Sequence, residues 1–134
     1  MEADHLNLFA STVFLGEPLP AGWPDSFVIV SAWATTGETW SRERNETADE
    51  ALRQALERVG LRPHRVIGAS PDLAHQEPSW AVDMSPESAD ELAEHFLQVA
   101  FFAVERGQLF VVPTGLPDAA VPLGPWAERV RRIE

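Results

Sequence analysis

The sequence contains no cysteine, lysine or tyrosine among its 134 residues. The absence of cysteine excludes disulfide bonds and thiolate metal sites. No apolar run approaches the roughly 18 residues that a membrane-spanning helix needs, and no basic leader precedes an apolar stretch at the N-terminus. From these absences we expect a cytoplasmic protein that does not act at a membrane.

Basic residues are scarce, since ten arginines face 21 acidic residues and the formal net charge is −11. A protein that binds the phosphate backbone needs a basic surface to displace counterions, so nucleic acid is not an expected partner. Arginine without lysine, beside abundant alanine and proline, indicates a GC-rich bacterial genome and says nothing about function. The acidic residues fall mainly on the predicted helices, which indicates a solvated surface.

Hydrophobic residues make up 45% of the chain, which is enough apolar material to form a core in one domain. We predict a single domain over 1–134 with its core in 27–112. The remaining 113–134 is a proline-rich tail that we expect to end in a short helix.

Two amphipathic segments predict helices. In the first, apolar residues recur every three or four positions from Ala48 to Val59, and Gly60 ends the helix. Its start is left open, because both Ser41 and Thr47 have the chemistry of a capping residue. The second helix begins at 85–86, where a serine cap is followed by proline, and it continues to about position 100.

Apolar runs of strand length surround the two helices. They occupy 11–15, 27–33, 66–67, 79–84, 101–104 and 109–112. The order strand, helix, strand, strand, helix, strand predicts an α+β fold of the ferredoxin-like (split βαβ) type. Such a fold has a mainly antiparallel sheet with two helices on one face, here with an extra N-terminal strand and a C-terminal hairpin strand.

The predicted topology brings distant polar residues to one end of the domain. The residues that meet there are Trp33 after a strand, Asn45 near a helix start, Glu77 before a strand and Gln98 at a helix end. We therefore expect any ligand site to lie at this end.

The same positions carry a family resemblance. Ala32-Trp33 ends an aliphatic strand, Asn45 lies near the next helix start, and Glu77-Pro78-Ser79-Trp80 opens a later strand. The second helix closes on the stretch Gln98-Val99-Ala100-Phe101-Phe102. In the order and spacing of these motifs, over about 27–112, the chain resembles a group of small bacterial proteins known as domain of unknown function 3293. The resemblance implies no activity.

The chain departs from the family pattern at two places. Family members usually carry Asn-Pro after the tryptophan, where this chain has Ala34-Thr35, and often an acidic residue before the helix asparagine, where this chain has Arg44. A role that depends on those groups is not expected here.

Glu77 has two interpretations. Beside Pro78 and near Trp80, its carboxyl group would be desolvated, with a raised pKa suited to a general acid or base. Alternatively, the carboxylate accepts hydrogen bonds from loop amides and fixes the turn. We favour the second interpretation, because the sequence offers no nucleophile or metal partner.

Arg42, Arg44 and Asn45 lie at the start of the first helix, where free amides and the helix dipole attract anions. The alternative is that the arginines pair with Glu43, Glu46 or other surface acids. Both interpretations stay open.

Gln98 and Ser79 complete the set of candidate site residues. Gln98 is polar in an apolar stretch, so its amide satisfies buried backbone groups or the loop at Glu77, or else contacts a ligand. Aromatic residues give a similar choice: we favour core positions for Trp33 and Trp80, and leave core and pocket open for Trp40. The histidines lack metal-ligand spacing, so neither a metal nor a cofactor is expected.

The sequence has no nucleophile elbow and no glycine-rich phosphate loop, and a catalytic role is therefore disfavoured. The leading hypothesis is a non-catalytic module that binds a small anionic ligand or a protein segment. Its candidate site residues are Trp33, Arg42, Arg44, Asn45, Glu77, Ser79 and Gln98. One alternative is a small hydrolase or transferase that uses Glu77. Another is an adaptor or homodimer formed through exposed sheet edges.

Overall fold

The computed structural model describes residues 3–34 and 38–132. Its helices are α1 (Ala3–Ala10), α2 (Arg42–Arg58) and α3 (Pro86–His95), with short 3₁₀ turns η1 (Pro117–Ala119) and η2 (Trp126–Glu128). Its strands are β1 (Val13–Gly16), β2 (Phe27–Val30), β3 (His64–Ala69), β4 (Gln76–Val82), β5 (Ala100–Glu105), β6 (Gln108–Pro113), β7 (Val121–Pro125) and β8 (Val130–Arg132).

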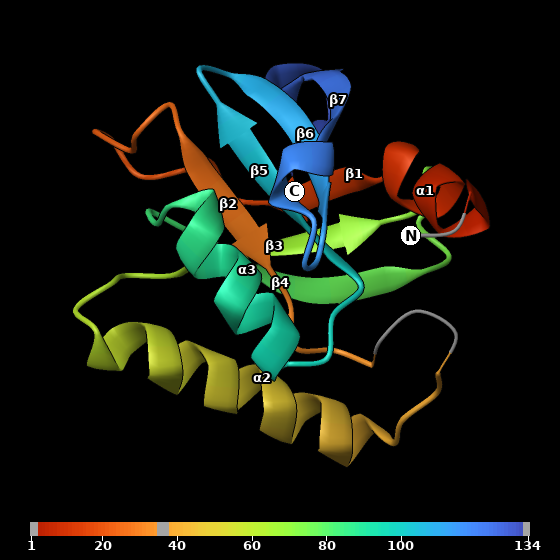
Figure 1. The fold of residues 1–134 in the computed structure, drawn as a ribbon, viewed down its shortest axis with the longest axis vertical. Coiled ribbons are helices and arrows are strands. Elements are labelled where there is room, and N and C mark those ends of the chain that lie inside the picture. The colour runs from red at the N-terminus through yellow and green to blue at the C-terminus, as the bar shows by residue number, and fades with distance from the viewer. Residues whose placement is uncertain (1–2, 35–37, 133–134) are drawn as a thin grey trace.

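The strands of the described chain form an eight-stranded sheet in the order β7-β6-β5-β2-β4-β3-β1-β8. The pairings are antiparallel, except that β1 and β8 run parallel. The sheet is strongly curled into a half-barrel, with α2 and α3 outside the curl and α1 beside β1 (Figure 1). The first and last of the described strands, β1 and β8, are neighbours at one edge of the sheet.

The prediction of a ferredoxin-like fold with a mainly antiparallel sheet and two helices on one face is wrong. Over 3–34 and 38–132 the chain forms a mixed, curled sheet of eight strands with three short helices. In the predicted tail, the short 3₁₀ turn η2 is followed by strand β8, which is the last described element. These added strands widen the sheet on both sides, and its curl encloses apolar side chains on the face away from α2 and α3.

Each face of the sheet has its own hydrophobic cluster. The outer cluster lies under α2 and α3 and includes Val28, Val30, Leu52, Leu56, Val82, Ala89, Ala93 and Phe101. The inner cluster lies within the curl and includes Phe14, Phe27, Ile29, Val66, Ala81, Phe102, Val104 and Leu109, with Leu6 and Phe9 of α1 against it. Burial of such large apolar side chains on both faces is what stabilises a sheet that would otherwise leave one face wet.

The helix ends follow the local sequence. Ser41 caps α2, since its hydroxyl accepts a 3.1 Å hydrogen bond from the Arg44 amide, and this settles the choice between Ser41 and Thr47. Ser85 caps α3 in the same way, ahead of Pro86, as predicted. The start of α2 at Arg42 places Asn45 one turn inside the helix.

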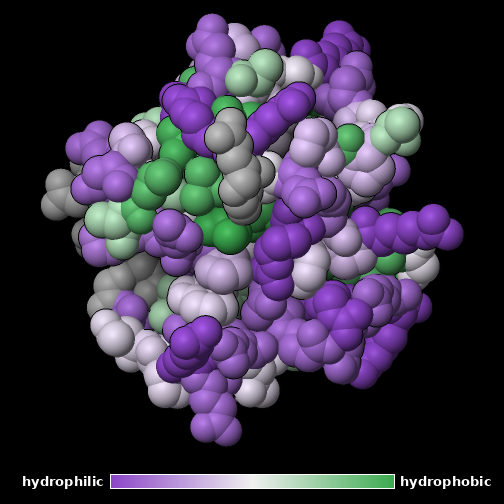
Figure 2. Space-filling view, turned by 180° about the vertical axis from the view of Figure 1, so that it is seen from behind, coloured by the Kyte–Doolittle hydropathy of each residue, from purple (hydrophilic) through white to green (hydrophobic). Residues whose placement is uncertain are grey.

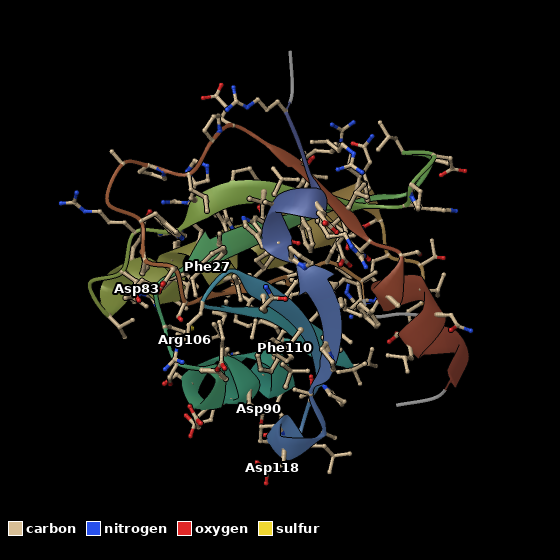
Figure 3. The ribbon with its side chains drawn as sticks, turned by 90° about the horizontal axis from the view of Figure 1, so that it is seen from above. Phe27, Asp83, Asp90, Arg106, Phe110 and Asp118 are labelled. Atoms are coloured by element: carbon tan, nitrogen blue, oxygen red, sulfur yellow. The ribbon has the colours of Figure 1, made fainter. Side chains whose placement is uncertain are left out.

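A side chain of α3 fixes the connection between β6 and β7. Asp90 accepts a 2.8 Å hydrogen bond from the amide of Gly115, and Figure 3 shows Asp90 next to η1, the turn that carries Asp118.

The face of the molecule that lies behind the view of Figure 1 is mostly hydrophilic, with one apolar area in its upper half (Figure 2). Over the described residues, every helix is too short or too polar to cross a bilayer.

Candidate functional site

A cleft of about 610 Å³ opens at the end of the curl, between α1, the β3–β4 turn and the segment that follows β2. Clefts of this volume are typical of small-molecule sites. Its aromatic lining comes from Phe9, Trp33, Trp40 and Phe102. The ionisable side chains that line its described part are Glu38, His75 and Glu77, and its other polar lining includes Asn45 and Ser79.

Glu77 faces this cleft because of its place on β4. Side chains alternate along the strand, and Ala81, four residues on, belongs to the inner cluster, so Glu77 and Ser79 share the inner face. Burial against this apolar surface raises the pKa of the Glu77 carboxyl from 4.5 to about 7. The residue still keeps some solvent contact through the cleft.

The Glu77 carboxylate has no hydrogen-bond partner among the described residues. The prediction that loop amides fix this carboxylate therefore finds no support in the described part of the chain. A desolvated carboxyl group that faces a cleft and has no partner there is instead available to bind a ligand.

Three side chains hold the backbone that follows β2. The Asn45 amide oxygen accepts a 2.7 Å hydrogen bond from the Ala34 amide, and Gln98 Nε2 donates to the Trp33 carbonyl at 2.8 Å. The hydroxyl of Ser31 accepts from the Trp33 amide at 3.1 Å and donates to the Pro78 carbonyl at 3.2 Å. These bonds join β2, β4, α2 and the end of α3 around one short backbone segment.

The period of α2 explains why Asn45 reaches this position. Leu56, Leu52 and Asn45 are spaced by four and seven residues, and all three are buried on the side of the helix that faces the sheet. A buried side-chain amide needs partners, and Ala34 supplies one. Asn45, with 6% of its surface exposed, thus has a positioning role in addition to lining the cleft.

Ser79 is buried, and its hydroxyl donates to the Glu77 carbonyl at 3.1 Å. The Ser79 carbonyl accepts from Arg65, whose guanidinium also pairs with Asp49 of α2 at 2.5 Å. Arg65 lies over the Trp80 ring at 3.6 Å. This contact set ties α2 to β3 and β4 behind the cleft.

The two arginines at the start of α2 lie outside the cleft lining. Arg42 pairs with Glu46 at 2.9 Å on the exposed surface, and the Arg44 guanidinium lies 3.8 Å from the centre of the Trp40 ring. Of the predicted site residues, the structure thus brings Trp33, Asn45, Glu77 and Ser79 into the lining, while Gln98 acts through the backbone of Trp33.

The tryptophans divide differently from the prediction. Trp80 packs against the outer cluster, as predicted, and Trp40 lines the cleft. Trp33, predicted to be a core residue, is partly buried and lines the cleft instead. Its place just after β2 puts the ring at the end of the sheet, beyond the strands that cover the core.

Several lining residues were missed by sequence reasoning, among them Phe9, His75 and Phe102. Phe9 comes from α1, a helix of eight residues that was not predicted. The three-residue spacing of the apolar residues Leu6 and Phe9 was the sequence pattern that could have indicated this helix. His75 precedes Glu77 by two residues, and this spacing places two side chains on one face of an extended strand. Phe102 lies in a predicted strand but carries no sign of a cleft.

Comparison with known proteins gives one match. The sequence model of a family described as "Protein of unknown function (DUF3293)" matches residues 30–101. No curated protein and no solved structure matches the chain. The matched stretch runs from the end of β2 into β5 and contains the positions that carried the resemblance except Phe102, and the match confirms that resemblance.

Proposed function

The chain belongs to the DUF3293 family of proteins of unknown function, and we propose that it binds a small molecule in the cleft at Glu77 without catalysing a reaction. The observation that carries this proposal is the Glu77 carboxyl group, which is desolvated in an aromatic-lined cleft and has no partner among the described residues. A polar group left in this state is stabilised when a ligand supplies the missing partner.

The shape of the site supports a small molecule. At about 610 Å³ the cleft falls within the range of sites that enclose drug-sized ligands. The Asn45 and Gln98 hydrogen bonds hold the Trp33–Ala34 backbone in place, so one wall of the cleft is already formed before a ligand arrives. A preformed wall lowers the ordering entropy that binding would otherwise require.

Thermal-shift screening with a library of small metabolites tests the proposal. We expect some compounds to raise the melting temperature, and the variant Ala74→Trp to abolish that rise, because Ala74 is exposed and lines the cleft. Ala51→Trp, on the exposed side of α2 and outside the cleft lining, is the matched control. Stabilisation that survives Ala74→Trp, or a library without any binder, would contradict the proposal.

One observation favours a second candidate, general acid–base catalysis. A carboxyl group with a pKa of about 7 exchanges protons readily at neutral pH. In this case a bound compound would be turned over, with a rate that inflects near pH 7 and is lost in Glu77→Gln. Recovery of every stabilising compound unchanged after long incubation would leave only the binding function.

A further inference from the structure

The charge of the cleft lining indicates the charge of its ligand. Among the described lining residues the ionisable side chains are Glu38, His75 and Glu77, and no arginine is present. The whole chain carries a formal net charge of −11. An anion would enter this cleft against two carboxylates, whereas a cation would be attracted to it.

The aromatic walls point in the same direction. Ring faces attract cations, and the protein already uses two of its tryptophans in this way: Arg44 lies over Trp40 at 3.8 Å, and Arg65 over Trp80 at 3.6 Å. Trp33 also lines the cleft, and no cation of the described chain lies over its ring. A cationic ligand beside Glu77 would have this ring as a further contact.

Building on the proposed function, we infer that the cleft binds an organic ammonium ion, a primary amine attached to a flat apolar group. The ammonium group donates hydrogen bonds to the ionised Glu77 carboxylate, while the flat group packs against Phe9, Phe102 and Trp33. Charge-assisted bonds of this kind are the stronger class of hydrogen bond, and the apolar surroundings strengthen them further. The anion expected from the sequence depended on Arg42 and Arg44, which lie outside the cleft lining.

Three probes that share one ring system separate the alternatives: 1-naphthylmethylamine, 1-naphthylmethanol and 1-naphthoate. Titration calorimetry at pH 8, where Glu77 is ionised, gives their affinities, and chemical-shift changes of the Trp33 and Trp40 indole signals locate them in the cleft. We expect the amine to bind about tenfold or more tightly than the alcohol, and the carboxylate to bind weakest.

Variants of matched charge then test the role of Glu77. Glu77→Gln should weaken binding of the amine about tenfold or more and leave binding of the alcohol nearly unchanged. Glu43→Gln, at an exposed position of α2 outside the cleft lining, removes the same charge and should leave both affinities unchanged. Equal loss of amine affinity in the two variants would show that only net charge matters and would overturn the inference.

Affinity as a function of pH gives an independent measurement. Between pH 8 and pH 5 protonation of Glu77 should weaken amine binding about tenfold or more, toward the affinity of Glu77→Gln. Because His75 and Glu38 also line the cleft, the same profile is measured in Glu77→Gln, and only the difference between the two profiles is assigned to Glu77. A profile that is identical in wild type and Glu77→Gln would overturn the inference.

The failures of the inference and of the proposed function have different signatures. If the alcohol or the carboxylate binds at least as tightly as the amine and shifts the indole signals, the ligand class is wrong while the binding function stands. If none of the three probes binds or shifts those signals, and the metabolite library also gives no cleft-dependent stabilisation, the binding function itself is wrong.

Discussion

Leu97 occupies at the end of α3 the left-handed backbone position that Gly60 occupies at the end of α2. Their φ angles are 61° and 83°. In each case the next residue donates its amide to a carbonyl in the last turn of the helix, Gln98 to Ala93 at 2.8 Å and Leu61 to Leu56 at 3.2 Å. Both helices therefore end in the same hydrogen-bonded turn. At α3 this turn directs Gln98 toward Trp33.

We predict that Leu97→Gly stabilises the protein by about 0.5–1 kcal/mol, because glycine adopts positive φ without the strain that leucine carries. Leu97 is 59% exposed, so little apolar burial is lost. The converse change, Gly60→Ala, should destabilise by about 1 kcal/mol through the backbone alone, since a Cβ there would meet no atom within 4 Å. Urea unfolding measures both, and a destabilised Leu97→Gly would contradict the assignment.

Asn45 and Gln98 should be energetically coupled, because they hold adjacent groups of one backbone segment, the Ala34 amide and the Trp33 carbonyl. Asn45→Ala and Gln98→Ala should each destabilise by about 1–3 kcal/mol, and the double variant by less than the sum. Hydrogen exchange of the Ala34 amide should accelerate in Asn45→Ala. Gln76 serves as the control, because its exposed side chain donates to the Leu73 carbonyl and not to the Trp33–Ala34 segment. The destabilisations by Asn45→Ala and Gln76→Ala should therefore add up in the double variant.

Glu77 should make stability depend on pH in a defined direction. Its folded-state pKa of about 7 lies above the ordinary 4.5, so the folded protein holds this proton more tightly than the unfolded chain. The associated stability is complete below about pH 4.5 and is lost as the pH rises through about 7, by about 3 kcal/mol.

The comparison of wild type with Glu77→Gln isolates this effect. Glutamine cannot ionise, so the variant should gain stability relative to wild type as the pH rises from 4.5 to 8, as measured by urea unfolding at fixed ionic strength. Glu43→Gln should show no such relative gain. A constant difference between wild type and Glu77→Gln across this range would show that the carboxyl group is not desolvated.

Arg65 should be sensitive to a change that keeps its charge. Its guanidinium bonds both oxygens of Asp49, at 2.5 and 3.0 Å, and covers the Trp80 ring, two contacts that lysine cannot reproduce together. We predict that Arg65→Lys destabilises by about 1–2 kcal/mol. Arg42→Lys, which alters an exposed pair with Glu46, should change stability by less than about 0.5 kcal/mol.

Local sequence signals predicted the helices and several strands because these depend on neighbouring residues. Ser41 and Ser85 cap helices through bonds to amides three residues on, and Gly60 ends α2 through its own backbone freedom. The hairpin of β5 and β6 likewise turns through the adjacent residues at 106–107, both of positive φ.

The curl of the sheet could not be predicted, because it depends on contacts between distant segments. Strand β8 pairs with β1, although the two strands are more than 100 residues apart. Phe14 of β1 likewise packs against Phe102 and Trp126, which both lie far from it in the sequence. No short window of sequence contains this information. The wrong fold class came from treating the outer strands as additions to a ferredoxin-like arrangement.

The candidate site was predicted in part. Asn45 and Glu77 both line the cleft, because each motif lies at the end of an element that points to the same region. Phe9 and Phe102 were missed, since they reach the cleft only through the curl and through α1. Polar motifs thus identified residues that line the cleft, whereas its aromatic walls depended on tertiary packing.

The pairing of β8 with β1 also bears on how the protein is made. Strand β1 leaves the ribosome early, but its outer neighbour is not available until residues 130–132 have been translated. Until then, the edge of β1 exposes free amides and carbonyls to any other chain nearby. A nascent molecule that stalls before residue 130 would therefore be a target for chaperones and for aggregation.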